Sequence, residues 1–351
     1  MADDRELKLG LVLGYWFAEP PTGVPEVIAA AEDLGFDSVW SAEAYGSDCF
    51  TPLAWYGSQT SRVRLGTGIA QMSARTPVAT AMSALTLDHL TGGRFILGLG
   101  ASGPQVVEGW YGQPYPRPLE RTREYVDVVR QVLAREAPVA IDGRHFQLPN
   151  RGEGTTGLGK PLRSITHPLR ADLPIYLGAE GPKNVAMTAE IADGWLPMFL
   201  SPALDEHYGA CLDEGFARAG ARRSRDDFEV AGLVNVVIDD DLDAAADAVR
   251  MFLGFYIGGM GAKEVNFHAD LFARMGHGEA VEEIQDLFLA GRKEEAIKRV
   301  PLALVEDVAM VGPIDKVREE LDERWRSTAM TTLLVSGNPD QLRTITDLVR
   351  G

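Results

Sequence analysis

The segment Leu65–Gly103, LGTGIAQMSARTPVATAMSALTLDHLTGGRFILGLGASG, contains an apolar strand pattern, a helix pattern and a second apolar strand pattern. Both expected strands end in small residues, at Gly66–Ile69 and at Gly98–Gly103. Because glycine weakens a strand interior, these endings indicate backbone that lies against a ligand. Thr76 is a suitable N-cap for the helix, Pro77 suits its first turn, and a glycine pair ends it. The segment therefore predicts a parallel sheet whose strand ends face a ligand, as in an enzyme.

The composition excludes several classes of partner. The chain has 351 residues, enough for two domains or for one large α/β barrel. Its formal net charge of −17 argues against binding to nucleic acid or to an anionic membrane surface. Cys49 and Cys211 give neither a disulfide framework nor a metal-binding spacing, and they fit a reducing compartment. The N-terminal stretch lacks a secretion signal, and no apolar run approaches the roughly 18 residues that span a bilayer. We expect a cytoplasmic protein without bound metal.

Strand and helix patterns alternate along the chain. The eight expected strands are 7–13, 38–40, 63–69, 95–99, 175–177, 194–196, 229–238 and 331–335. Two irregular stretches, about 137–172 and 258–301, interrupt the alternation; the first contains a hairpin pattern that turns at Asp142–Gly143, and the second a helix near 281–289. Eight alternating units favour a (β/α)8 TIM barrel over an open doubly wound sheet. We expect one barrel domain over 1–351 with two insertions.

The carboxyl ends of barrel strands are where an active site belongs. Here these ends are rich in aromatic residues and glycines, at 14–17, 41–48, 68–71, 100–103 and 178–184. They carry no metal-ligand spacing, nucleophile elbow or Walker loop. His89 lies on a helix, and we interpret it as structural. The pattern predicts a seat for a flat cofactor that brings its own chemistry. Candidate aromatic walls, for each of which packing in the core is an equally good interpretation, are Trp16, Trp40, Tyr45, Trp110, Tyr111 and Trp195.

The turn after the fifth expected strand is a candidate phosphate site. Gly181–Pro182 opens a helix, so we expect the amides of Lys183, Asn184 and Val185 to lack intrahelical partners. Those donors and the positive end of the helix dipole suit an anion. Glu180 is awkward beside an anion unless it points away, and Gly-Pro also opens many ordinary helices. The residues alone leave both interpretations open.

Four blocks of the chain resemble a known family. The blocks are GTGIAQMSARTPVATAMSALTLDHLTGGRFILGLGASGPQVVEGWYG at 66–112, IYLGAEGPKNVAMTAEIADGWLP at 175–197, WSAEAYGSD at 40–48 and YIGGMGAKEVNF at 256–267. They are similar to the luciferase-like flavin-dependent superfamily, in its coenzyme F420-dependent oxidoreductase branch, and to an actinobacterial group of uncharacterised members there. The similarity runs over essentially the whole chain. It implies a (β/α)8 barrel with insertions and a homodimer or higher homo-oligomer that pairs through helices near the start of the barrel.

The resemblance also implies where the cofactor binds. In this family the back of the ring lies on a bulge at the third strand with a non-proline cis peptide, which matches the Gly68–Ile69 bond. The phosphate contacts of the family match the turns after the fourth and fifth strands. The residues implied to bind the cofactor are Gly68, Ile69, Gly100, Ala101, Ser102, Gly103, Gly178, Ala179, Glu180, Gly181, Pro182, Lys183 and Asn184. Strand periodicity alone favours an ordinary trans peptide at Gly68.

The catalytic residues are less well matched to the family. Glu43 falls where many members carry an acidic residue beside the ring. Ala44 replaces a histidine that is thought to handle the substrate proton in relatives oxidising alcohols or sugar phosphates, which makes those reactions doubtful here. Glu43 or Tyr45 is left as the candidate proton donor or acceptor.

The sequence therefore predicts an oxidoreductase that transfers a hydride between coenzyme F420 and an unidentified organic substrate. The alternatives are an FMN-dependent monooxygenase of the same fold and a cofactor-binding protein without turnover. A basic stretch at Lys160, Arg163 and Arg170 is either a contact for the acidic tail of F420 or an ordinary solvated loop.

Overall fold

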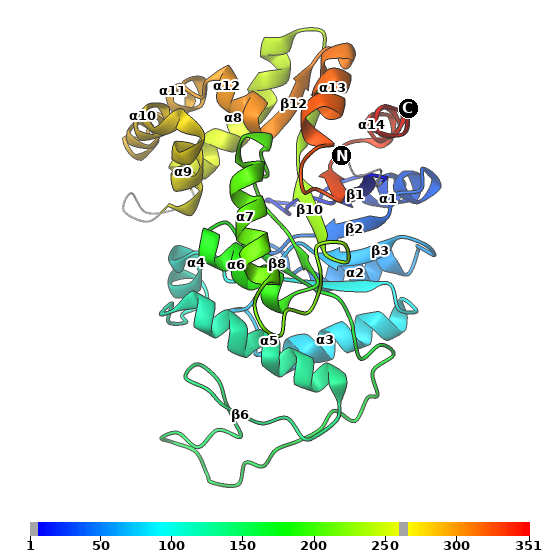
Figure 1. The fold of residues 1–351 in the computed structure, drawn as a ribbon, viewed down its shortest axis with the longest axis vertical. Coiled ribbons are helices and arrows are strands. Elements are labelled where there is room, and N and C mark those ends of the chain that lie inside the picture. The colour runs from blue at the N-terminus through cyan, green and yellow to red at the C-terminus, as the bar shows by residue number, and fades with distance from the viewer. Residues whose placement is uncertain (1–5, 260–265) are drawn as a thin grey trace.

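The computed structural model describes residues 6–259 and 266–351, and in this part of the chain parallel strands close into a barrel (Figure 1). Its strands are β1 (Lys8–Val12), β2 (Ser38–Ser41), β3 (Arg64–Thr67) continued by β4 (Ala70–Gln71), β5 (Phe95–Gly100), β8 (Ile175–Gly178), β9 (Gly194–Trp195), β10 (Glu229–Leu233) and β13 (Thr332–Val335). The strand order is β3-β2-β1-β13-β10-β9-β8-β5-β4, and β3 also pairs with β5, which closes the sheet. The predicted (β/α)8 barrel is confirmed.

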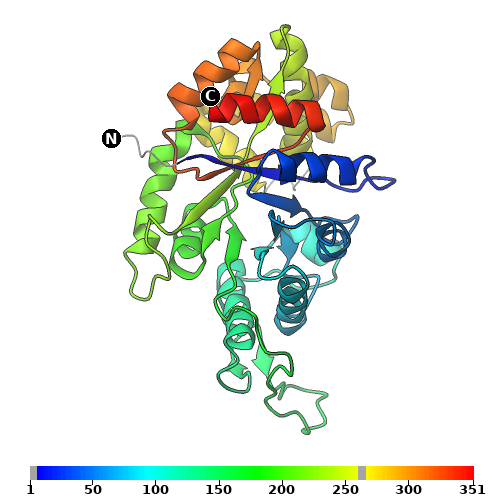
Figure 2. The same ribbon diagram turned by 90° about the vertical axis from the view of Figure 1, so that its right-hand side faces the viewer.

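Helices cover the outside of the barrel. They are α1 (Val24–Asp33), α2 (Phe50–Gly57), α3 (Pro77–Leu90), α5 (Pro118–Ala134), α6 (Pro182–Ile191), α7 (Asp205–Phe216), α8 (Leu242–Gly258), α13 (Ile314–Glu320) and α14 (Pro339–Arg350). The last helix, α14, lies beside the first helix, α1, in the outer ring (Figure 2). Helix α3 begins as predicted, because the Thr76 hydroxyl accepts a hydrogen bond from the Ala79 amide. None of the described helices is long and apolar enough to cross a membrane.

The barrel encloses a small apolar cluster of its own. Its buried members are Trp40, Ile96, Tyr176, Leu196, Ala231 and Leu334. Trp40 lies across the interior, and a β-carbon on Gly66 of the neighbouring strand would come within 2.3 Å of its ring. Glycine is needed here because the bulky indole takes the space that a side chain on β3 would fill. A much larger cluster fills the layer between strands and helices.

The seventh expected strand is two strands, which corrects the prediction of one strand over 229–238. Only β10 belongs to the barrel. Just after it, the Val234 amide donates to the Leu334 carbonyl of β13, which is the last hydrogen bond of this segment to a barrel strand. The chain then continues as β11 (Asn235–Ile238), which pairs in parallel with β12 (Ala309–Gly312) outside the barrel. An apolar run indicates a strand but not its partner, so the split left no signal in the sequence.

The two insertions lie in different places. In the first, β6 (Ile141–Asp142) and β7 (Gln147–Leu148) form the predicted hairpin, which extends from the barrel beyond α5 (Figure 1). The Glu124 carboxylate holds it there by accepting hydrogen bonds from the amides of Arg144, His145 and Phe146. The second forms a layer at the other end of the molecule (Figure 1), and part of it, 260–265, lies outside the described residues. Its helices are α9 (Phe267–Phe272), a π-helical turn η2 (Ala273–His277), α10 (Gly278–Leu289), α11 (Lys293–Lys298) and α12 (Leu302–Val308).

Several short elements were not predicted. Besides β12 and the short helices of the second insertion, they include α4 (Pro104–Gly109) and a 3₁₀ turn η1 (Pro202–Leu204), and α13 continues as a π-helical turn η3 (Leu321–Trp325). Each helical element among them is too short to show a helical period in the sequence.

Candidate active site

Ile69 fills the centre of the barrel mouth, between glycines of two neighbouring strands. A β-carbon on Gly100 would come within 2.7 Å of the Ile69 side chain, and one on Gly178 within 3.2 Å. The Gly68–Ile69 peptide is cis, as the resemblance implied. Because β5 and β8 carry glycines at these points, Ile69 lies against their backbone, and it also packs on the apolar cluster inside the barrel, so it forms an apolar floor to the mouth.

A β-bulge places this floor. Gly66 pairs with Ile96 and Ala70 pairs with Leu99, so the chain advances four residues along β3–β4 against three along β5. The Thr67 hydroxyl bridges the gap in the ladder, because it donates to the Gly98 carbonyl at 2.8 Å and accepts from the Gly98 amide at 2.9 Å. The bulge that the resemblance implied at the third strand is confirmed.

The turn between β8 and α6 borders the floor on one side. Gly181 is the N-cap residue of α6. Its carbonyl accepts hydrogen bonds from Asn184 and Val185, so the prediction that these two amides are free was wrong. The chain makes a tight first turn in which the N-cap carbonyl takes both donors. Among the described residues, the amides of Gly181 and Lys183 have no such partner.

The turn after β5 lies beside it. Gly100 ends the strand, Ala101 follows, and Ser102 has a left-handed backbone conformation with φ 59°. The Tyr115 hydroxyl donates to the Ser102 carbonyl at 2.9 Å and so holds the turn from outside. Gly103 then leads into α4. Since Gly100 pairs with Gly178 in the sheet, the two predicted phosphate turns are neighbours at one edge of the mouth.

Glu43 is held in a buried ion pair. One carboxylate oxygen accepts hydrogen bonds from Arg75 at 2.8 Å and from the backbone amide of Gln71 at 2.8 Å. The other oxygen accepts from Arg75 at 2.7 Å. The Glu43 side chain is 4% exposed, and the Arg75 guanidinium also lies over the Phe50 ring. Burial alone would lower the pKa of Arg75, but its hydrogen bonds to Glu43 and the charge of that carboxylate raise it. Glu43 thus fixes the backbone just after the bulge. The pairing of Arg75 with Glu43 was not predicted from the sequence.

Tyrosines gather on the opposite side of the mouth. Tyr45 is half-exposed on the loop after β2, and Tyr15 follows β1. Burial raises the pKa of Tyr15; a hydrogen bond to the Tyr256 hydroxyl of α8 lowers it, and the nearby Tyr45 raises it. The Tyr256 ring meets the His268 ring of α9 edge-on at 5.0 Å, and burial lowers the pKa of His268 to about 4. Sequence reasoning missed Tyr256 and His268, which lie in or beside the second insertion.

The other predicted aromatic walls divide between core and surface. Trp40 is in the barrel interior, and Trp195 is buried against Tyr208 of α7. Trp110 is mostly exposed, whereas the Tyr111 hydroxyl reaches the Ala44 carbonyl at 3.3 Å.

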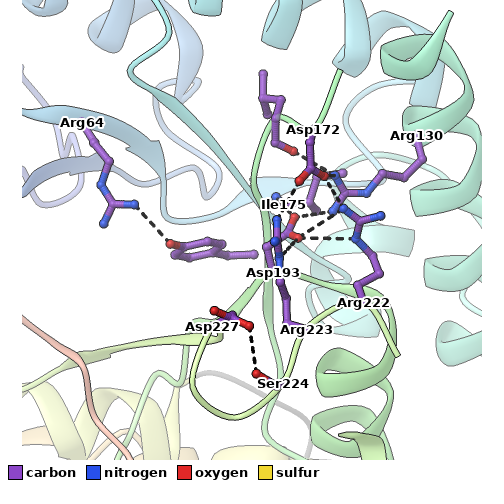
Figure 3. A network of polar contacts seen from close by, with 11 residues as sticks. Arg64, Arg130, Asp172, Ile175, Asp193, Arg222, Arg223, Ser224 and Asp227 are labelled. Atoms are coloured by element: carbon purple, nitrogen blue, oxygen red, sulfur yellow. Dashed lines mark hydrogen bonds and ion pairs between the residues drawn. The ribbon is translucent and has the colours of Figure 1, made fainter. Parts of the chain in front are cut away.

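The densest network of charged groups is at the other end of the barrel (Figure 3). Asp193 directly precedes β9, and burial alone would raise the pKa of its carboxyl, but nearby arginines lower it. Its partners are Arg130, Arg222, Arg223 and the Ile175 amide. Because barrel chemistry takes place at the carboxyl ends of strands, this network serves stability.

Arg170 of the basic stretch lies at this amino-terminal end too. It pairs with the buried Asp88 and donates to the Phe95 carbonyl at 2.7 Å, a structural role that neither interpretation of the stretch included. The chain from α5 must reach the amino-terminal end of β8, and Arg170 lies on this segment, so it is placed at that end of the barrel. His89 bonds the His167 carbonyl at 2.8 Å, in agreement with a structural role.

Comparisons with known proteins identify relatives along the full length. The chain is 60% identical to "Putative coenzyme F420-dependent oxidoreductase Rv3520c" from Mycobacterium tuberculosis, over 98% of this chain and 99% of that one. It is 29% identical to 5,10-methylenetetrahydromethanopterin reductase from Archaeoglobus fulgidus, over 89% and 88% of the two chains. The structure of the coenzyme F420-dependent tetrahydromethanopterin reductase from Methanopyrus kandleri superposes with a TM-score of 0.77, 27% identity and 98% coverage of both chains. The model of the luciferase-like monooxygenase family matches residues 11–332. The chain therefore belongs to the luciferase-like monooxygenase family.

Proposed function

We propose that this protein is a coenzyme F420-dependent oxidoreductase acting on a small organic substrate. The observation that carries the proposal is the apolar floor at Ile69, walled by Gly100 and Gly178 and bordered by the start of α6. Two relatives whose names include coenzyme F420, at 60% and 27% identity, support this choice of cofactor. When bound, a deazaflavin supplies hydride transfer, which side chains cannot perform themselves.

The residues present fit such a cofactor. The glycines let the Ile69 side chain lie against the backbone of β5 and β8, where a β-carbon would crowd it, and the apolar surface so formed is the one on which we place the flat ring. Beside the floor, a β-carbon on Gly181 would meet nothing within 4 Å, so the backbone of the turn is open to close approach. The cofactor would be held by Gly68, Ile69, Gly100, Ala101, Ser102, Gly103, Gly178, Ala179, Glu180, Gly181, Pro182, Lys183 and Asn184.

We assign different roles to the two catalytic candidates. Glu43 has both oxygens occupied by Arg75 and the Gln71 amide, so it positions the backbone beside the ring. Tyr45 is half-exposed at the mouth and near Tyr15, and its phenol supplies or accepts the substrate proton that the histidine of other members handles. The Tyr15–Tyr256 hydrogen bond forms the wall behind it.

Titration of the apo-protein with F420 and with FMN, followed by fluorescence quenching, tests the cofactor. We expect F420 to bind at least tenfold tighter, which corresponds to about 1.4 kcal/mol. Tighter binding of FMN, together with oxygen consumption dependent on reduced FMN, would establish the FMN-dependent monooxygenase instead. Tight F420 binding without turnover of any compound in a substrate panel would support the other alternative, a cofactor-binding protein without turnover.

A substitution at Gly181 tests the anion site without disturbing the fold. Gly181→Val should weaken F420 binding about tenfold or more, because its methyl groups obstruct approach to the turn, while the melting temperature stays unchanged. Lys183→Ala should weaken binding less, because Lys183 is exposed and its side chain adds only a screened charge. Gly278→Val on α10, another uncrowded glycine, is the matched control. Equal F420 affinity in all three variants would show that the turn does not bind the cofactor.

We also propose that the protein is a homodimer that pairs through α2 and α3. Trp55 of α2 and Met82 and Leu90 of α3 are more than half exposed, and the two helices are in contact. Large apolar side chains on adjacent surface helices are typical of a protein interface. Light scattering should give twice the chain mass of 38.1 kDa, and Trp55→Glu should reduce it to the monomer value.

A further inference from the structure

Glu180 has one carboxyl oxygen that is bound and one that is not. Its Oε1 accepts a hydrogen bond from the Met198 amide at 2.7 Å. Its Oε2 is buried and has no hydrogen-bond partner among the described residues. A buried polar atom without a partner destabilises the folded protein, and most buried polar groups have a partner. A hydrogen-bonding group from a bound ligand would give this second oxygen its partner.

The position of Glu180 places it at the proposed anion site. It directly precedes Gly181, the N-cap residue of α6, at the carboxyl end of β8. Along β8, Tyr176 faces the barrel interior, and a β-carbon on Gly178 would meet Ile69. The alternation of a strand continues this inward series to Glu180. Its Oε1 meets the Met198 amide, just after β9, so the carboxyl lies at the mouth beside the turn that opens α6.

The surroundings of Glu180 favour the uncharged acid. Burial raises its pKa to about 8, although the bond from the Met198 amide acts in the opposite direction. From α7, the Tyr208 hydroxyl donates to the Glu180 carbonyl at 3.3 Å, and burial keeps that phenol neutral by raising its pKa. The other charged or titratable groups nearby are Arg274 of η2, which lowers the pKa of Tyr208, and Cys211 of α7, which raises it. Lys183 is exposed on the turn itself. No described cation forms an ion pair with Glu180 to stabilise its charge.

We infer that Glu180 binds the cofactor as a neutral acid, with its Oε2–H donating a hydrogen bond to an anionic phosphate-type oxygen at the start of α6. This inference rests on the proposed function. A neutral carboxylic acid removes the repulsion that a carboxylate would exert on the anion, and it gives the second oxygen its partner. The bound anion in turn stabilises the proton, so tight binding requires Glu180 to be protonated.

Glu180→Gln is the discriminating variant, because its amide keeps both interactions. The amide oxygen accepts from Met198, and the amide N–H donates to the anion whatever the pH. F420 is titrated into wild type and variant between pH 6 and 9.5, and the ratio of the two dissociation constants is followed. This ratio cancels every pH dependence that wild type and variant share, including that of the ligand. We expect it to stay within about threefold below pH 7. Above pH 8, wild-type affinity should fall by up to tenfold per pH unit relative to the variant.

Two further measurements complete the test. In weakly buffered solution at pH 8.5–9, wild type should take up nearly one more proton per bound F420 than Glu180→Gln does. Glu180→Ala should bind at least tenfold more weakly than Glu180→Gln at every pH, with thermal unfolding used to confirm that each variant is folded. Parallel pH curves for wild type and Glu180→Gln, or equal affinities of the Ala and Gln variants, would overturn the inference alone. Failure of wild type to bind F420 at any pH would overturn the proposed function and this inference with it.

Discussion

Gly98→Ala should destabilise the barrel by roughly 3 kcal/mol or more, or prevent folding altogether. The added β-carbon would lie 1.9 Å from the Thr67 carbonyl oxygen and 2.8 Å from the Leu196 side chain. A flexible side chain could move, but the oxygen belongs to the backbone of β3. That backbone is fixed because the Thr67 hydroxyl already bonds both polar groups of Gly98. Relief of the collision therefore requires that the strands separate.

Urea unfolding followed by circular dichroism measures this loss. The matched control is Gly181→Ala, whose β-carbon meets nothing within 4 Å and whose φ of −74° suits any residue. We expect the control to stay within about 0.5 kcal/mol of wild type. If Gly98→Ala unfolded at the same urea concentration as the control, the close approach of β3 and β5 would be wrong.

Arg75→Met should lower the unfolding free energy by about 3–5 kcal/mol at neutral pH, because it leaves the Glu43 carboxylate buried without its countercharge. In wild type, Arg75 occupies both oxygens of that carboxylate. Only the Gln71 amide would remain to stabilise it.

The double variant Glu43→Gln/Arg75→Met separates charge from packing. It has no buried charge, so we expect it to recover at least half of the lost stability at pH 7. Arg75→Lys should recover little, because a single ammonium cannot match the two-oxygen contact of the guanidinium. Chemical unfolding of wild type and the three variants at pH 7 gives the comparison. If the double variant were as unstable as Arg75→Met alone, the loss of stability would not come from the unpaired Glu43 charge.

The alternation of patterns was sufficient to predict the barrel, because parallel strands and amphipathic helices each have a clear period. Thr76 and Pro77 fixed the start of α3 from chemistry that acts within one turn. The bulge at Ile69 is different, because strand periodicity favoured an ordinary strand there and only the family resemblance indicated the cis peptide. Interactions within a few residues are readable from sequence, and this bulge depends on contacts with β5 and β8.

The parts of the site that sequence reasoning missed all depend on distant residues. Arg75 reaches Glu43 across 32 positions, and Tyr256 meets Tyr15 from α8. The amides of Asn184 and Val185 were expected to be free, but a tight first turn binds them to Gly181. Arg170 was grouped with other basic residues, although its partner Asp88 lies 82 positions away. Such pairings follow from the closed barrel, and no local pattern encodes them.

The pairing of β11 with β12 divides the mouth of the barrel between two separate structural units. Ile69 and its glycines belong to the closed sheet, whereas Tyr256 and His268 are carried by α8 and α9 of the outer layer. Because β11 makes its ladder with β12, changes in this layer leave the hydrogen bonds of the barrel strands intact. We therefore expect changes in this layer to alter the compounds that are accepted while the proposed cofactor floor stays the same. Exchange of residues 235–312 between family members is accordingly a direct route to chimeras with altered substrate range.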